Sequence, residues 1–134
     1  MGPINMGDRF VTVLKLSNQQ QIADQCSVAD HFLSRLKGWM GVSSLARGSG
    51  LLLSPCNDIH MWFMRVSIDA VFLQYEKTTP QGAHWKVTSV FKELKPWKVL
   101  PVRDASAQAT LELPAGMVAS CAIEKGDTLC ISSQ

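Results

Sequence analysis

The chain has no stretch that is long and apolar enough to cross a membrane. It has 134 residues, 46% of them hydrophobic, and no window approaches the ~18 consecutive apolar residues of a membrane-spanning helix. The first ten residues, "MGPINMGDRF", lack the basic and apolar regions of a secretory signal peptide. We therefore expect a cytoplasmic protein without a membrane span, although a mature form whose leader has been removed has the same features.

Charge is scarce and nearly balanced. Charged residues make up 18% of the chain, and the formal net charge is +2. The basic residues are scattered, apart from a loose group of Lys92, Lys95 and Lys98, and this pattern argues against binding of a phosphate backbone. We expect no nucleic-acid partner, and the sequence leaves the oligomeric state open.

Cysteine pairs and the common cofactor motifs are also missing. Cys26, Cys56, Cys121 and Cys130 form no CxxC pair, and each stands among small or apolar residues, which favours free buried thiols over disulfides. The sequence holds no GxGxxG, P-loop, GxSxG or HExxH pattern. Without these motifs, the sequence predicts neither a metal site nor a cofactor.

Short segments of alternating or continuous apolar residues are abundant. They predict strands at 10–16, 22–29, 51–54, 59–64, 68–75, 85–94, 107–113 and 128–132. In the predicted strand 85–94, strict alternation places Trp85, Val87, Ser89 and Phe91 on one face. Helical spacing predicts a helix near 30–41, and Pro114 predicts the start of a short one.

These elements predict an α+β fold that is mostly β. We expect a compact barrel-like or sandwich-like antiparallel sheet of about seven or eight short strands with one or two short helices. Residues 1–9 are expected to form a flexible N-terminal segment, and residues 10–134 one domain. The segment 95–105, with two prolines, is expected to cross a sheet edge in an extended conformation.

Several motifs in a fixed order resemble one known family. They are "RLKGWMG" (35–41), "GLLLSPC" (50–56), "IHMWFMRVSIDAVFL" (59–73), "KPWK" (95–98), "LELPAG" (111–116) and "KGDTL" (125–129). Together they resemble the bacterial and archaeal family called domain of unknown function 192, over about residues 23–131. The resemblance implies a single, mostly β, barrel-like domain and implies no activity. The chain departs from the family pattern at Trp39, Val42, Ser67 and Ala122, which we interpret as packing variations.

Ionisable residues interrupt the apolar segment 56–72. Arg65 and Asp69 are four residues apart across a predicted bend, where a guanidinium can fold back onto a carboxylate. One interpretation is that this pair holds the bend within a buried sheet. The other is that Arg65 faces a mouth and binds an anionic ligand while Asp69 orients it.

The sequence predicts a ligand site built from His60, Trp62, Arg65, Asp69 and Trp97. Trp62 and Trp97 would line an apolar mouth, with Arg65 at its polar edge. The same tryptophans could instead plug the end of a barrel, and a single histidine on an apolar face is often a core residue. Our main functional hypothesis is a non-enzymatic binding module for a small anionic or amphiphilic ligand, or for an extended peptide.

Two alternatives remain open at this point. The first is a hydrolase-like enzyme that uses His60 or Asp69 as a base and Cys56 as a nucleophile. Cys56 and His60 would lie roughly 13 Å apart on a strand, so that pair requires a turn at 56–58. Asp104 and Glu112 have no partner at a spacing that supports acid–base catalysis. The second alternative is an accessory domain whose motifs serve the fold alone.

Overall fold

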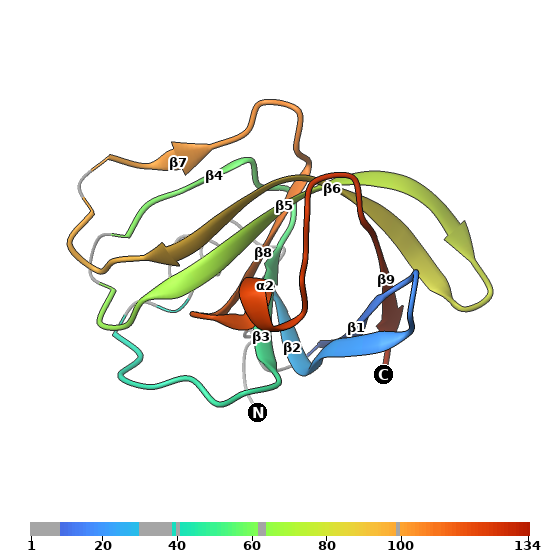
Figure 1. Cartoon of the computed structure of the whole chain (residues 1–134), viewed down its shortest axis with the longest axis horizontal. Coiled ribbons are helices and arrows are strands. Elements are labelled where there is room, and N and C mark those ends of the chain that lie inside the picture. Colours follow the sequence, from blue (N-terminus) through green and yellow to red (C-terminus); the bar gives the residue numbers. More distant parts are fainter. Residues whose placement is uncertain (1–8, 30–38, 40, 62–63, 99) are drawn as a thin grey trace.

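The structure of the chain is a computed structural model that describes residues 9–29, 39, 41–61, 64–98 and 100–134. Nine strands and one short helix lie within these residues (Figure 1). They are β1 (Phe10–Lys15), β2 (Gln20–Ala29), β3 (Ser49–Leu53), β4 (Asp58–Ile59), β5 (Ile68–Thr79), β6 (Gly82–Leu94), β7 (Val102–Arg103), β8 (Ala109–Pro114), α2 (Met117–Ser120) and β9 (Thr128–Ser133).

Seven of the strands close into a barrel. Their order is β1-β2-β3-β8-β5-β6-β9, and β9 pairs with β1 to complete the ring. The predicted mostly β, barrel-like fold is therefore confirmed. The expectation of a wholly antiparallel sheet is wrong at one place, because β2 and β3 run parallel. Alternation along each strand predicts strands, but it does not predict the direction in which two strands pair.

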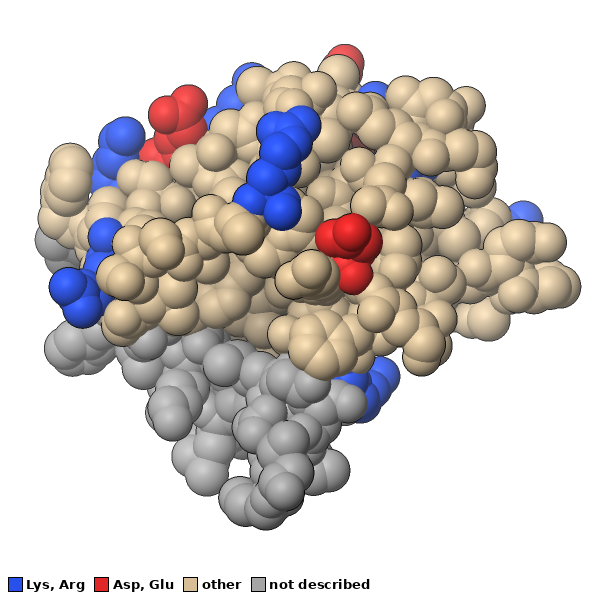
Figure 2. Space-filling view, turned by 90° about the horizontal axis from the view of Figure 1, so that it is seen from below, with Lys and Arg blue, Asp and Glu red and all other residues tan. Residues whose placement is uncertain are grey.

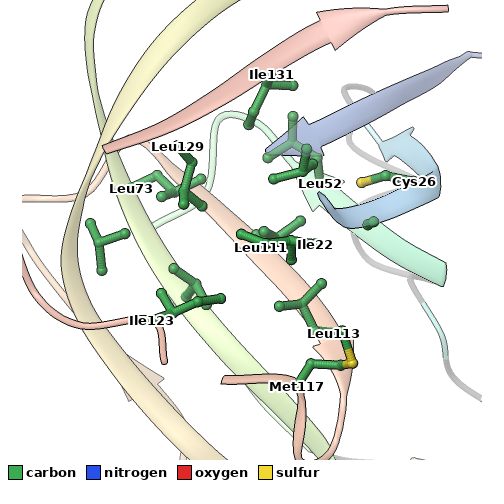
Figure 3. Packing of buried hydrophobic residues seen from close by; sticks show 14 of the residues in the cluster. Ile22, Cys26, Leu52, Leu73, Leu111, Leu113, Met117, Ile123, Leu129 and Ile131 are labelled. Atoms are coloured by element: carbon green, nitrogen blue, oxygen red, sulfur yellow. The ribbon is translucent and has the colours of Figure 1, made fainter. Parts of the chain in front are cut away.

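The barrel interior is the main hydrophobic core. All seven barrel strands contribute to one cluster of buried side chains, part of which is shown in Figure 3. The cluster includes Leu52, Val71, Val87, Leu111 and Leu129. Met117 and Val118 of α2 join the same cluster, so this helix covers part of the barrel core.

A second cluster lies outside the barrel. Ile59 of β4 and Val102 of β7 pair as a two-stranded ribbon, and both pack with Ile68, Ala70 and Phe72 of β5. The ribbon therefore covers the outer face of β5 (Figure 1). Because the barrel wall is buried on both sides here, β5 begins as an almost continuous apolar run rather than an alternating one.

The β5–β6 hairpin carries a bulge that the sequence did not predict. Phe72 pairs with Ser89, whereas the next residue, Leu73, pairs with Val87, so Thr88 is the extra residue. A bulge reverses the alternation beyond it. Val87 therefore faces the barrel core while Phe91 packs in the outer cluster, and the prediction that these two residues share a face is wrong.

Two other predicted elements differ from the structure. The strand expected at 59–64 is limited to β4, which ends at Ile59, and residues 62 and 63 lie outside the described part of the chain. The short helix begins at Met117 rather than near Pro114, which ends β8. Gly116, with φ of 96°, adopts the left-handed conformation that redirects the chain into the helix.

Most of the helix predicted at 30–41, and residues 1–8 of the predicted N-terminal segment, also lie outside the described residues. Among the helices that the structure describes, none is long and apolar enough to span a bilayer.

Candidate functional site

Asp69 anchors the start of α2 through its carboxylate. Its side chain is completely buried. One carboxylate oxygen, Oδ1, accepts the backbone N–H of Glu93 at 2.8 Å. The other, Oδ2, accepts the N–H groups of Gly116 at 3.1 Å and of Val118 at 2.8 Å. These two donors lie at the start of α2, so Asp69 satisfies the helix terminus from a neighbouring strand.

Arg65 does not pair with Asp69. Arg65 is exposed, and none of the ion pairs between described residues involves it. The predicted Arg65–Asp69 pair is therefore wrong. The backbone N–H groups of Glu93, Gly116 and Val118 instead supply the hydrogen bonds that satisfy this buried carboxylate.

The other described residues of the predicted ligand site differ in exposure. His60 is half-buried and follows β4, and its Nδ1 atom is buried. Trp97 is 76% exposed, so this tryptophan does not plug the barrel end. Trp62 lies outside the described residues. Because Trp62 is not described, the joint ligand site of these residues stays a prediction, and the described residues offer a different candidate site.

Cys56, the nucleophile of the hydrolase hypothesis, is half-buried. Its Sγ donates to the backbone oxygen of Asp58 at 3.1 Å. Burial raises the pKa of this thiol above its usual value, and repulsion from the nearby carboxylate of Glu112 adds to the shift. A raised thiol pKa lowers the fraction of reactive thiolate at neutral pH.

We expect Cys56 to react with iodoacetamide more slowly in the folded protein than in the urea-unfolded chain at the same pH. The readout is mass-spectrometric labelling of each cysteine over time, with buried Cys26 as the internal comparison. Labelling of Cys56 in the folded protein that outpaces the unfolded chain would restore the nucleophile hypothesis.

Glu112 is a buried carboxyl group that sequence reasoning passed over. It is 7% exposed and lies on β8 between Leu51 of β3 and Ala70 of β5. Burial raises the pKa of its carboxyl to about 7. The signal was present in the sequence, because a glutamate between Leu111 and Leu113 in a strand buried on both faces has to face an apolar layer.

An open groove of about 850 Å³ among the described residues is a candidate site. Its lining residues come mainly from β6, the β7–β8 loop and the turn before β9. The groove is lined by Gln74, Lys86, Val87, Thr88, Ser89, Phe91, Arg103, Asp104, Ala105, Ser106, Lys125 and Gly126. This volume is within the usual range for small-ligand sites in proteins.

The bulge in β6 builds the polar side of the groove. Because Thr88 is the extra residue, it and Ser89 can both face Asp104, and each hydroxyl donates to Oδ2 of Asp104 at 2.7 Å. The other oxygen, Oδ1, accepts the hydroxyl and the backbone N–H of Ser106 at 2.6 and 3.0 Å. These hydrogen bonds outweigh desolvation and hold the pKa of Asp104 well below its usual range. The carboxylate is therefore fixed and its lone pairs are occupied.

Three cationic side chains lie around the same groove. Lys86 comes from β6, Arg103 from β7 and Lys125 from the turn before β9. Arg103 also pairs with Asp58 at 3.1 Å, but this pair is exposed, with 70% and 49% of the two side chains accessible, and is readily screened. The cations outnumber the one carboxylate among the described lining residues.

The described residues supply no cluster of three or more histidine, cysteine or carboxylate groups that could hold a metal ion.

Figure 2 shows a face on which Lys and Arg side chains are separated by uncharged surface. That face therefore offers no continuous basic surface to a polyanion.

The family resemblance predicted from the motifs is confirmed by a match to a protein-family model. Residues 13–131 match the model of DUF192, described as "Uncharacterized ACR, COG1430". The chain belongs to the DUF192 family. A UPF0127 protein of Thermococcus kodakarensis strain KOD1 is 29% identical over 106 residues, which are 76% of this chain and 61% of that protein.

Two solved structures share the fold. One, from Sinorhizobium meliloti 1021, is described provisionally as a transcription regulator. It has a TM-score of 0.74 and 17% identity, and the match covers 98% of each chain. The other, a protein of unknown function from Novosphingobium aromaticivorans, has a TM-score of 0.70 and 21% identity, covering 89% of this chain and 81% of that one. At these identities the similarity shows the DUF192 barrel and carries no function across.

Proposed function

We propose that this DUF192 domain is a non-enzymatic binding module and that its ligand is a small amphiphilic anion held in the groove beside β6. The observation that carries the proposal is the convergence of Lys86, Arg103 and Lys125 on one groove. Its single described carboxylate, Asp104, is already bound by three neighbouring residues. A carboxylate, phosphate or sulfate group would find donors there, and at Arg103 it would compete only with Asp58 in an exposed ion pair.

The groove also has an apolar part, which is why the ligand is taken to be amphiphilic. Phe91 and Ala105 line it together with the cations and hydroxyls. Phe91 packs edge-on against Phe72, with ring centroids 5.7 Å apart, so its position is held by the outer cluster. A preorganised aromatic wall contributes binding area at little entropic cost.

A small ligand fits better than an extended peptide. Peptides that bind as an added strand need a free sheet edge. Each barrel strand is paired on both sides, and the β4–β7 ribbon, the other described sheet, is two residues long on each strand. These short edges provide little backbone for a peptide.

The hydrolase alternative receives less support. It relied on Cys56 with a base at His60 or Asp69. Asp69 is fully bonded to backbone N–H groups, and burial raises the pKa of Cys56. All four cysteines are free thiols, which supports the reducing cytoplasm proposed from the sequence.

Isothermal titration with hexyl phosphate tests the proposal, and uncharged hexanol and cationic hexylamine serve as matched probes. We expect hexyl phosphate to bind more tightly than the other two. The double substitution Lys86→Gln and Lys125→Gln should weaken binding by about tenfold or more, because two charge-assisted contacts are lost.

Lys77→Gln is the matched control, because Lys77 is an exposed lysine of β5 that does not line the groove. It should leave hexyl phosphate affinity unchanged. Equal affinity for hexyl phosphate and hexylamine, or full affinity in the double variant, would show that the groove is not an anion site.

A further inference from the structure

The loop between β6 and β7 exposes the two most accessible large apolar side chains among the described residues. Trp97 is 76% and Leu100 72% exposed, compared with 41% for Phe10 and 44% for Tyr75. The loop projects at the left edge of Figure 1. Neither Trp97 nor Leu100 belongs to a described hydrophobic cluster, so packing in the core does not explain why they are exposed.

The local backbone holds Trp97 outward. The N–H of Lys98 donates to the carbonyl of Lys95 at 3.1 Å, which closes a turn with Pro96 and Trp97 at its two central positions. Proline at the second position of a turn presets its backbone angle. Pro101 restricts the chain again just after Leu100. A preset loop loses little conformational entropy when it docks.

The charges around these apolar residues are mainly positive. Lys92 and Lys95 are exposed and Lys98 is half-buried, whereas Glu93 is the one acidic residue between 92 and 98. This segment is the group of lysines that stands out in an otherwise scattered distribution. A partner that docks on this loop should therefore carry negative charge and offer an apolar site for an indole ring and a leucine side chain.

We propose that this loop, residues 95–98 and 100–101 with Lys92, docks onto an anionic lipid bilayer. Tryptophan favours the interface between headgroups and acyl chains, and each lysine near an anionic surface adds to the attraction. A specific protein partner needs a complementary surface of ~800 Å² on each side, far more than one turn presents. A bilayer needs no such complementarity. This proposal is independent of the groove beside β6.

Co-sedimentation with lipid vesicles tests this proposal. We expect the protein to sediment with vesicles made of equal parts phosphatidylcholine and phosphatidylglycerol, and to remain in solution with phosphatidylcholine alone. Trp97→Ala should weaken the partition by about tenfold, and Lys95→Gln with Lys98→Gln by a similar factor. Raised salt should weaken binding of the parent protein.

Phe10→Ala and Lys77→Gln are the matched apolar and charged controls, since both residues are exposed elsewhere in the barrel. Circular dichroism confirms that each variant folds. No sedimentation of the parent protein with either vesicle would overturn the proposal, as would sedimentation that Trp97→Ala leaves intact. A dimer in solution that Trp97→Ala abolishes would show that the loop binds a second copy of the chain instead.

Discussion

We expect Asp69→Ala to lower the free energy of unfolding by about 3–5 kcal/mol, a large part of the total stability of a small domain. The substitution leaves the N–H groups of Glu93, Gly116 and Val118 without their acceptor. Each buried donor left unpaired costs about 1–3 kcal/mol. Chemical denaturation measures the loss, and amide hydrogen exchange should rise first at the start of α2.

Arg65→Gln is the control for this measurement. Arg65 is exposed and does not contact Asp69, so its substitution should change stability by no more than about 0.5 kcal/mol. If Asp69→Ala were as stable as the parent protein, the anchoring of α2 by this carboxylate would be disproved. If Arg65→Gln were as costly as Asp69→Ala, the ion pair inferred from the sequence would be reinstated.

The second large effect concerns pH. Burial raises the pKa of Glu112 from 4.5 to about 7 in the folded protein, whereas the unfolded chain keeps the ordinary value. Between these values the unfolded state releases a proton that the folded state retains. The free energy of unfolding therefore falls as pH rises through this window, by ~3 kcal/mol in total, and the contribution is fully present below the lower pKa.

Glu112→Gln should remove this slope, because glutamine resembles the protonated carboxyl and does not ionise. Denaturation curves collected from acid to neutral pH give the difference in stability between parent and variant, in which contributions common to the two proteins cancel. Glu124→Gln, at an exposed position, should retain the parent slope. A parent protein whose stability does not fall faster with pH than that of the Glu112 variant would contradict the burial of an unpaired carboxyl at this position.

The fold was largely predictable from local patterns. The first two strands, the apolar run of β3 and the last two strands were expected within a few residues of their observed limits. These segments follow period-two alternation or form short apolar runs between turn residues, and both signals depend on the chain's immediate neighbours.

Features that depend on distant residues were not predictable in this way. The parallel pairing of β2 with β3 and the bulge at Thr88 are set by how strands meet around the ring. Gly82 shows the same dependence: a side chain there would meet the backbone oxygen of Ile131 at 2.8 Å, a contact with β9 nearly fifty residues later.

The partners of Asp69 were not predictable for a related reason. Sequence reasoning paired Arg65 with Asp69 because they are close in the chain, and it had no means to know that α2 would approach Asp69. The groove joins Thr88 and Ser89 to Asp104, which lies on another element, and only the bulge brings both hydroxyls to the same side. No spacing rule in a single sequence indicates such a cluster.

The proposed anion site is tested most directly by a nitrogen–proton NMR titration of the labelled protein with hexyl phosphate. We predict that the largest shift changes occur at the backbone amides of Ser89, Ser106 and Gly126 around the groove, and that they follow one saturable curve. Hexylamine should leave these amides unchanged. Saturable changes centred on other residues, with the groove amides unmoved, would contradict the proposed site.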